Sequence, residues 1–333
     1  STPLYSSAAS DVYKRQSSDH AQLQRLGASD VWYKSFVLPR SARLSYKMAP
    51  DVPELPASDT ARRRAILATA QADPFNPKAY PERGIDAFQY SSVLELAEAP
   101  AQPWVAPRAG VEPGTVQTHA LASTILGNTR DIQLYRPAGW RPGGADNHVL
   151  VLFDAGPYLS RVPTPTILDN MIAAGVIPPT AAVLISNPTA DSRAAELPPN
   201  PDFADFLARE LMPWAARQGI AAPAARTVIG GSSYGGLASS YAALRHPEVF
   251  GNVLSQSGSY WWGQPGQEDQ WLTRQFAARR TLPVRFYLVA GLFEMGRAGQ
   301  PGIVETNRHL RDVLQAKGYR VTHQEVAGGH DYL

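Results

Sequence analysis

Hydrophobic and polar positions change their spacing near residue 115 of this 333-residue chain. From there on, short apolar runs alternate with longer segments in which apolar residues recur every three or four positions. The first run, "HVLVLFDAG" over residues 148–156, is continuously apolar, as expected of a strand buried on both faces. This alternation predicts a parallel sheet covered by helices on both faces. The other predicted strands are 182–186, 227–229, 252–256, 284–290 and 320–326, and the predicted helices are 166–174, 203–218, 235–245, 268–280 and 303–317.

The part of the chain before this alternation is organised differently. Residues 115–124 and 129–137 have the composition of two long strands joined at Gly127-Asn128, which predicts a hairpin. Further upstream, strand-like composition at Trp32, 35–37, 44–46 and 92–96 predicts a small β-rich domain, and 60–71 predicts a short helix capped by Ser58 or Asp59. We therefore divide the chain into a polar, disordered leader or cloning remnant (1–20), a β-rich domain with a linker (21–105) and a larger α/β domain (106–333).

Composition excludes several functional classes. The chain is 44% hydrophobic, carries a net charge of +2 and contains no cysteine. No strong basic field favours nucleic acid or an anionic membrane, and the longest apolar runs are far too short to span a bilayer. The absence of cysteine excludes disulfides, thiolate zinc sites and cysteine nucleophiles. We expect a small-molecule partner and a cytoplasmic protein, although lack of disulfides suits any compartment and a native leader could have been lost before Ser1.

The segment "TVIGGSSYGGLASSYAALRHPEVFG", residues 227–251, contains two serines between glycine pairs. Residues 231–235 satisfy G-x-S-x-G with Ser233 at the centre, and the motif follows a short apolar strand and precedes a helix, as a nucleophile elbow requires. Flanking glycines give room to a strained turn, and the helix start directs N–H groups toward a developing oxyanion. The alternative is a glycine-rich turn without chemistry. The strand–turn–helix context favours the nucleophile.

A serine hydroxyl needs a base, and in the α/β-hydrolase fold the chain order is serine, acid, histidine. The chain has seven histidines, and His330 alone follows the last predicted strand, in "AGGHDYL". We therefore predict His330 as the base. For the acid we predict Glu294, just past strand 284–290, with a solvated loop glutamate as the alternative. Asp331 is expected to point away from His330 because neighbouring side chains diverge, and Glu305 belongs to the following helix.

The remaining site positions surround the elbow. The backbone N–H groups of Tyr234 and of Ala155, in "LFDAGPY", are predicted to form the oxyanion hole, with Asp154 and Gly156 shaping the loop. Predicted substrate-contacting side chains are Tyr158, Arg161, Arg193, Trp261 and Trp262.

Two of these predictions have structural alternatives. Arg193 either forms an ion pair with Glu196 or meets a substrate anion, since a guanidinium matches oxyanions well. Trp261 and Trp262, which follow Tyr260, either form a platform for an aromatic acyl group or fill the core.

Several motifs together resemble those of a known family. "FADFLARELMPW", "RTVIGGSSYGGLASSYAALRHPEVFGNVLSQSGSYWW" and "GGHDYL" resemble, in this order, the enterochelin (ferric enterobactin) esterases within the esterase D-type α/β hydrolases. "LQRLGASDVWYKSFVLPRSARLSYKM" with "DPFNP" is similar to the N-terminal β-sandwich domain of that family. The resemblance implies an α/β-hydrolase catalytic domain over 106–333 and a serine esterase that cleaves siderophore trilactones, with Ser233, His330 and Glu294 as its triad.

The chain departs from the family pattern in three places. It has Asp154-Ala155-Gly156 where the family has an aspartate-glycine pair, it lacks the opening strands, and it ends before a final helix. We therefore expect a truncated N-terminal β-sandwich and some uncovered apolar surface.

The predicted chemistry is acyl transfer without a metal or an organic cofactor. A ferric catecholate is a trianion, so its pocket should present basic residues, for which Arg161 and Arg193 are the candidates. One alternative is a general aryl, feruloyl or polyester carboxylesterase that uses Trp261 and Trp262 as its platform. The other is a noncatalytic binding protein on a hydrolase fold, which the complete set of Ser233, Glu294 and His330 disfavours.

Overall fold

A computed structural model describes residues 5–6, 22–52, 59–80, 90–296 and 299–333. The chain divides into two compact units. Unit 1 comprises residues 1–101, 291–304 and 325–333, and unit 2 comprises 102–290 and 305–324. The first unit therefore combines the N-terminal domain with two segments from the last part of the chain.

The main sheet has eight strands in the order β15-β14-β13-β12-β10-β11-β9-β8. β10 pairs in parallel with β11 and β12, and the parallel ladder continues through β13 to β14. β8 and β9 form the predicted hairpin, and β9 runs antiparallel to β11. The strands are β8 (Thr115–Ser123), β9 (Asn128–Arg136), β10 (His148–Leu152), β11 (Thr180–Ile185), β12 (Thr227–Ser232), β13 (Asn252–Gln256), β14 (Arg285–Gly291) and β15 (Arg320–Val326).

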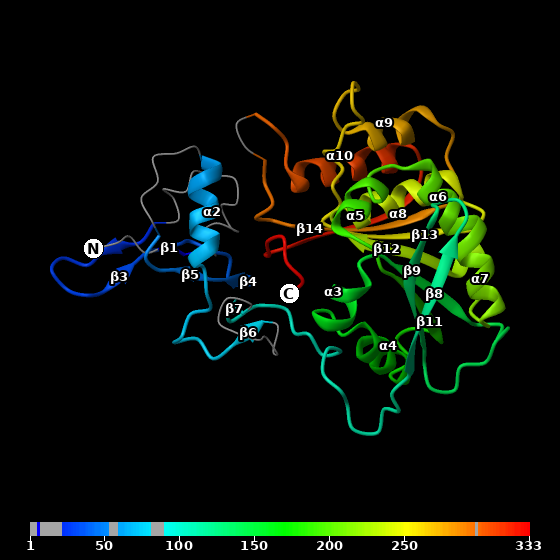
Figure 1. The fold of residues 1–333 in the computed structure, drawn as a ribbon, viewed down its shortest axis with the longest axis horizontal. Coiled ribbons are helices and arrows are strands. Elements are labelled where there is room, and N and C mark those ends of the chain that lie inside the picture. Colours follow the sequence, from blue (N-terminus) through cyan, green and yellow to red (C-terminus); the bar gives the residue numbers. More distant parts are fainter. Residues whose placement is uncertain (1–4, 7–21, 53–58, 81–89, 297–298) are drawn as a thin grey trace. The chain divides into compact units, whose positions relative to one another are not determined.

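Helices connect these strands and cover the sheet. In Figure 1, α3 and α4 lie on one side of the sheet of unit 2, and α8 and α9 lie on the other. The observed order confirms the predicted α/β-hydrolase fold, with a mainly parallel sheet and helices on both faces. The helices are α3 (Ala155–Ser160), α4 (Thr164–Ala173), α5 (Ala190–Glu196), α6 (Pro201–Phe206), α7 (Met212–Arg217), α8 (Tyr234–Arg245), α9 (Trp271–Ala278) and α10 (Ile303–Ala316).

Local chemistry explains where these helices differ from the predicted ones. The predicted helix 203–218 is divided into α6, a π-helical turn over Leu207–Leu211, and α7. Pro213 has no N–H group and its ring conflicts with a carbonyl one turn earlier, so a wider turn before it is physically reasonable. The short helices α3 and α5 are absent from the sequence prediction because their residues resemble a loop. α9 is shorter than predicted, since Gln270 before it takes a left-handed conformation with φ 59°.

The core of unit 2 places α8 rigidly against the sheet. Every residue from Gly235 to Leu244 of this helix is buried. Its glycines, alanines and serines allow close approach to β12 and β13, where Ile229 and Val253 lie in the same apolar cluster as Leu237. The start of α8 therefore has a well-defined position at the carboxyl ends of the strands.

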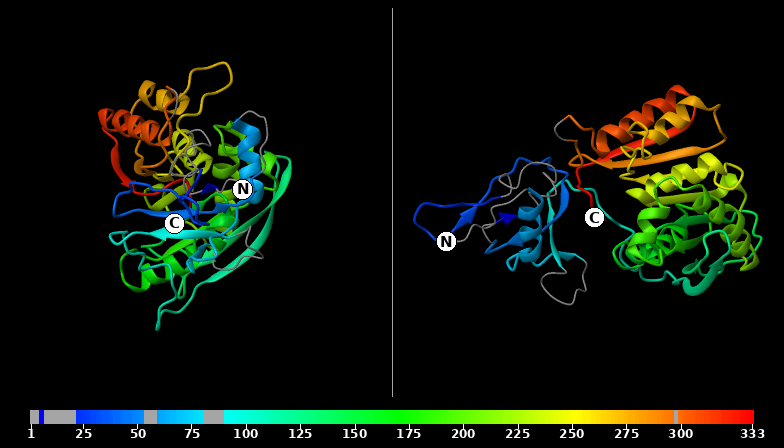
Figure 2. Two further views of the ribbon diagram at one scale, coloured as in Figure 1. Left: turned by 90° about the vertical axis from the view of Figure 1, so that its left-hand side faces the viewer. Right: turned by 45° about the horizontal axis from the view of Figure 1, so that its top comes forward.

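Unit 1 contains small sheets and one helix among its described residues. β4 (Arg43–Tyr46), β7 (Ser91–Glu95) and β6 (Ala79–Tyr80) form a sheet in the order β4-β7-β6. α2 (Asp59–Thr69) is the blue helix in Figures 1 and 2. Two further pairs of short strands complete this part, β2 (Gln24–Arg25) with β3 (Trp32–Tyr33), and β1 (Tyr5–Ser6) with β5 (Met48–Ala49).

Three predictions concern the N-terminal part of the chain. The strand expected at 35–37 is wrong: these residues form no strand, and Val37 is 98% exposed with Pro39 close behind it. Tyr5 and Ser6 form a short strand within the expected leader, and the rest of residues 1–20 lies outside the described residues. The capping prediction at Ser58 also lies outside them, whereas Asp59 is the first residue of α2.

Within the described part of the chain, every helix is too short or too polar to traverse a lipid bilayer.

Candidate active site

Ser233 lies at the sharp turn between β12 and α8. Its φ of 59° and ψ of −119° belong to a region that residues with a Cβ rarely adopt. The Ser233 N–H donates to the carbonyl of Gln256 at 3.0 Å, and its own carbonyl accepts from the Ser259 N–H at 3.0 Å. Hydrogen bonds with the last residue of β13 and with the loop after it therefore hold the strained turn. The side-chain hydroxyl lies 3.2 Å from that of Ser259, which is buried.

The glycines around Ser233 do not all have the same role. A Cβ on Gly231 would lie 2.9 Å from the backbone of Gly235, and one on Gly236 would lie 2.5 Å from Ser255 Oγ. A Cβ on Gly235 would only reach ordinary contact distance, 3.6 Å from Phe153. Steric crowding therefore requires glycine at 231 and 236, whereas the final glycine of the motif is not required for space.

Tyr260 supports the turn from within the core. Its side chain is fully buried, and its hydroxyl lies 2.8 Å from Ser255 Oγ and 2.7 Å from Ser240 Oγ on α8. Burial raises the pKa of Tyr260 to about 12, although the hydrogen bonds with the two serines lower it. The phenol therefore stays neutral and joins α8 to the end of β13.

The two predicted oxyanion donors occupy equivalent places, at the starts of the helices that follow two adjacent strands. Tyr234 is the first residue of α8 and Ala155 is the first residue of α3. N–H groups at the first turn of a helix have no partner inside it, so both can meet an external acceptor. β10 and β12 are paired with Leu152 opposite Gly230, which brings the two turns side by side.

Asp154 shapes the loop before Ala155. It takes a left-handed conformation with φ 55°, and its carboxylate accepts two hydrogen bonds from Arg193, Nε at 2.5 Å and Nη2 at 2.7 Å. Such a bidentate pair fixes orientation as well as charge. The Arg193 side chain, 34% exposed, therefore holds the loop that precedes Ala155, the predicted oxyanion loop.

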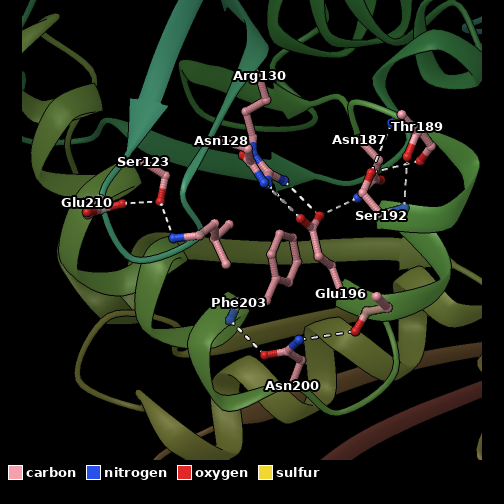
Figure 3. A network of polar contacts seen from close by, with 12 residues as sticks. Ser123, Asn128, Arg130, Asn187, Thr189, Ser192, Glu196, Asn200, Phe203 and Glu210 are labelled. Atoms are coloured by element: carbon pink, nitrogen blue, oxygen red, sulfur yellow. Dashed lines mark hydrogen bonds and ion pairs between the residues drawn. The ribbon is translucent and has the colours of Figure 1, made fainter.

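The ion pair between Arg193 and Glu196, one of the two alternatives for Arg193, does not form. Glu196 instead accepts from Arg130 on β9, at 2.9 Å and 2.7 Å, in a buried pair (Figure 3). Residues three apart on one helix can pair, but here each finds a partner on a different strand or loop. α5 therefore connects the oxyanion loop on one side with β9 on the other.

Further polar contacts hold α5 in place, as Figure 3 shows. Thr189 and Ser192 form a reciprocal capping box at its start. At its end, Asn187 donates to Glu196 at 2.8 Å and Asn200 donates to the Ala195 carbonyl at 3.1 Å. The Thr189-x-x-Ser192 spacing is the sequence signal that could have predicted this helix.

The predicted substrate-contacting aromatic residues have different surroundings. Trp261 lies beside Tyr234, with ring centroids 6.0 Å apart, and is therefore next to the turn at Ser233. Trp262 packs edge-on against Trp271 at the border of the core, which fits its structural alternative. Tyr158 is only 3% exposed and donates its hydroxyl to Gln256 Oε1 at 2.5 Å, so little of it is available to a substrate. Arg161 is exposed at the end of α3.

The predicted acid and base are paired within unit 1. The Nδ1 atom of His330 forms a hydrogen bond with Glu294 Oε1. Glu294 is 8% exposed, and its second carboxylate oxygen accepts from the Gly291 N–H at 2.7 Å. Because Nδ1 donates to the carboxylate, Nε2 is the ring nitrogen left to accept a proton. The pair therefore has the form of a general base with its orienting carboxylate.

The other carboxylates near His330 have different partners. The carboxylate of Asp331 accepts from the backbone N–H and the hydroxyl of Ser45, both at 3.0 Å.

Elsewhere, His246 contacts Asp205 at 2.8 Å and Glu248 at 3.0 Å, which agrees with a structural role at the end of α8.

Across the described ranges, no three His, Cys, Asp or Glu side chains are grouped so as to hold a metal ion.

Comparisons with known proteins identify the family. Residues 123–333 match the family described as putative esterase, and residues 6–105 match the one described as enterochelin esterase, N-terminal. The iron(III) enterobactin esterase of Escherichia coli O6:H1 is 32% identical over 96% of this chain and 80% of that protein. This chain belongs to the enterochelin esterase family. As a member of this family it is a carboxylic ester hydrolase.

Solved structures agree with this assignment. The enterobactin esterase FES from Shigella flexneri, in the presence of enterobactin, is 30% identical, with a TM-score of 0.77 over 99% of this chain and 83% of that one. The ferric enterobactin esterase from Salmonella typhimurium has a TM-score of 0.79, with 28% identity over 99% and 84% of the two chains. A ferulic acid esterase from Anaeromyces mucronatus, 16% identical with a TM-score of 0.56 over 70% of this chain and 90% of that one, shares the fold. The enterochelin esterase family is thus supported by sequence and structure over nearly the whole chain.

Proposed function

We propose that this esterase hydrolyses the ester bonds of enterobactin-type siderophore trilactones through an acyl-enzyme on Ser233. The observation that carries the chemistry is the strained elbow, in which a serine with φ 59° begins a buried helix. The substrate class follows from relatives that are named as iron(III) enterobactin esterases and match 96% of this chain.

The proposed reaction has two halves. In the first, Ser233 Oγ attacks the ester carbonyl while His330 Nε2 takes the hydroxyl proton. Glu294, bonded to Nδ1, keeps the imidazole in the required tautomer and stabilises its charged form. His330 then returns the proton to the departing alcohol, which leaves an ester on Ser233. In the second half, water attacks this ester with the same base and releases the acid.

The N–H groups of Tyr234 and Ala155 are proposed to hold the negative oxygen of each tetrahedral intermediate. Their support is that both are first residues of helices at the ends of paired strands. The Arg193–Asp154 pair then fixes the position of the Ala155 N–H group. Removal of a single oxyanion donor typically costs about a hundred-fold to a thousand-fold in kcat.

The proposed substrate surface lies beside the elbow. Trp261 offers an aromatic face to a catechol ring, and Arg161 offers positive charge to a ferric catecholate. Trp262 and Tyr158 contribute mainly by packing beneath this proposed substrate surface. Arg193 contributes chiefly through Asp154, and its partly exposed edge adds to the positive potential.

Turnover of a short nitrophenyl ester by Ser233→Ala tests the chemistry. We expect loss of nearly all turnover, because the variant removes the nucleophile. The unfolding midpoint should be preserved or raised, which shows that the loss of turnover is not a loss of folding. Labelling by a fluorophosphonate should occur in the parent and not in the variant. Full turnover by Ser233→Ala would end the proposal, and a parent chain that never labels would favour a noncatalytic binding protein.

Parallel hydrolysis of enterobactin and methyl ferulate tests the substrate class. We expect a much larger kcat/KM for the trilactone, because the cationic and aromatic groups together match a catecholate. Hydrolysis of methyl ferulate without cleavage of enterobactin would instead support the general aryl esterase.

A further inference from the structure

The segment that carries His330 is attached on both of its sides within unit 1. On one side it meets the segment that carries Glu294: Leu292 N–H donates to the Val326 carbonyl at 2.8 Å, and Phe293 N–H donates to the Gly328 carbonyl at 3.2 Å. A Cβ on Gly291 would lie 2.6 Å from Gly328 O, so the two segments are in close contact. These bonds set the position of Glu294 relative to His330.

On its other side the same segment meets β4 of the N-terminal domain. Arg43 N–H donates to the Ala327 carbonyl at 3.1 Å. Two residues further along β4, the N–H and the hydroxyl of Ser45 both donate to Asp331 Oδ2 at 3.0 Å. His330 therefore lies between two attachment points, Ala327 and Asp331, whose partners both belong to β4.

The geometry of β4 explains why these two residues act together. β4 is an edge strand in the order β4-β7-β6, so one row of its backbone groups faces away from β7. Alternate N–H groups of a strand point to the same edge, which places those of Arg43 and Ser45 in one row. An uncovered edge invites pairing with other chains, and here the His330 segment covers it.

Asp331 takes the place that a backbone carbonyl would occupy in a further strand. Its Oδ2 accepts both bonds from Ser45, and its Oδ1 accepts from the Leu333 N–H at 3.1 Å. Hydrogen bonds to a carboxylate are stronger than those between neutral groups. Ser45 is only 8% exposed, so water competes little for these bonds. The carboxylate is thus committed to β4 and leaves the imidazole to Glu294.

We propose that Ser45 and Asp331 are positioning residues for the catalytic base, through which the N-terminal β-domain holds the His330 segment in its working position. This inference rests on the proposed function, because it gives His330 the role of the base. It gives the N-terminal domain a part in turnover of any ester, in addition to any part in substrate recognition.

The test uses the full-length chain and a short nitrophenyl ester, which is too small to need recognition by the N-terminal domain. We expect Ser45→Ala and Asp331→Ala each to lower kcat between about ten-fold and a hundred-fold with little change in KM, because misplacing a catalytic group by about 1 Å has effects of that size. The double variant should resemble Asp331→Ala alone, since the hydroxyl of Ser45 acts through that carboxylate. Ser45→Thr, which keeps the hydroxyl, should restore kcat.

Two further measurements separate positioning from general destabilisation. The pH profile of kcat/KM should shift in Ser45→Ala, because the environment of the base changes. Ser92→Ala is the matched control: Ser92 is a buried serine on the neighbouring strand β7, and its hydroxyl accepts from the Asp73 N–H at 2.9 Å. This control should lose stability while its kcat and pH profile stay those of the parent.

The outcomes distinguish this inference from the function on which it rests. If Ser233→Ala and His330→Ala are inactive but the Ser45 and Asp331 variants keep the parent's kcat and pH profile, the inference is overturned. An equal fall in kcat for Ser92→Ala and Ser45→Ala would overturn it as well. If His330→Ala retains full turnover, the proposed function itself is wrong.

Discussion

Single residues show how differently local and distant information enter this site. The sharp turn at Ser233, between a strand and a helix, could be predicted because the elbow motif, its glycines and its helix are contiguous in the sequence. The partners of Arg193 and Asp331 could not, because Asp154 is 39 residues from the first and Ser45 is 286 residues from the second. Pairing of this kind depends on which strands become neighbours, and no local pattern specifies it.

One residue-scale prediction concerns Glu95 in β7. Hydrogen bonds from Lys78 and then from Arg43 lower its pKa from 4.5 to about 2. The pKa of Glu95 is lower in the folded chain than in the unfolded one, so its ion pairs with Lys78 and Arg43 stabilise unit 1 above about pH 4.5. This contribution is lost as the pH falls toward 2. Lys78 is largely exposed, so the effect is modest. Urea unfolding over this pH range should show a smaller acid dependence for Glu95→Gln than for the parent, and identical slopes would contradict the assignment.

At the scale of elements, the sequence predicted the alternating strands and helices of unit 2 well and the short helices poorly. Long apolar runs and amphipathic periods specify β10 and α8 because burial dominates there. α3 and α5 have seven residues or fewer, too few for a periodic pattern to indicate them. A capping box begins α5, whereas α3 follows the left-handed Asp154, whose carboxylate is paired with Arg193. Both short helices border the loop at Asp154, which α3 follows and to which Arg193 of α5 is paired, so the hardest elements to predict are those that depend on an ion pair between distant residues.

The start of α8 gives an element-scale prediction. Gly236→Ala places a Cβ 2.5 Å from Ser255 Oγ and 3.0 Å from Gly258 Cα, so we expect a cost of about 1–3 kcal/mol and a displaced elbow with reduced turnover. Gly235→Ala is the control, because its Cβ reaches only ordinary contact distances and alanine favours a helix. Denaturant unfolding and esterase assays of both variants measure the difference. Equal stability of the two variants would show that packing at 236 is looser than described.

The buried pair behind α5 gives a second one. Arg130→Met leaves the Glu196 carboxylate buried without its cation, for which we expect destabilisation by about 3–5 kcal/mol. Replacing both residues with apolar ones should recover much of this loss. Arg209→Met is the comparison: Arg209 is 66% exposed and lies 3.5 Å from Asp205, so this pair should contribute about 1 kcal/mol or less. A single Arg130 variant as stable as the parent would mean that Asn128 and Asn187 satisfy Glu196 without the cation.

On the scale of the whole molecule, the chain leaves the α/β domain twice to complete unit 1. Residues 291–304 and 325–333 bring Glu294 and His330 to the N-terminal domain, while Ser233 belongs to unit 2. The predicted boundary near residue 105 was drawn from composition. Composition could not reveal that two later segments join the earlier unit, because their partners on β4 are far away in sequence.

This arrangement predicts the result of removing the N-terminal domain. A chain without residues 1–90 loses β4, so the Ala327 carbonyl and the Asp331 carboxylate lose their strand partners. We expect far-ultraviolet circular dichroism to show that the sheet of unit 2 persists, with turnover of a nitrophenyl ester reduced more than ten-fold. Undiminished turnover by the shortened chain would mean that His330, the proposed base, keeps its place without β4.

The backbone of Ser233 carries a cost that the rest of α8 must offset. A serine at φ 59° is strained by about 1–3 kcal/mol, whereas glycine would accept the same angles with ease. Ser233→Gly should therefore have a larger free energy of unfolding than the parent but no esterase turnover. If Ser233 is the nucleophile, as proposed, its hydroxyl is kept at a cost in stability that a glycine would not have.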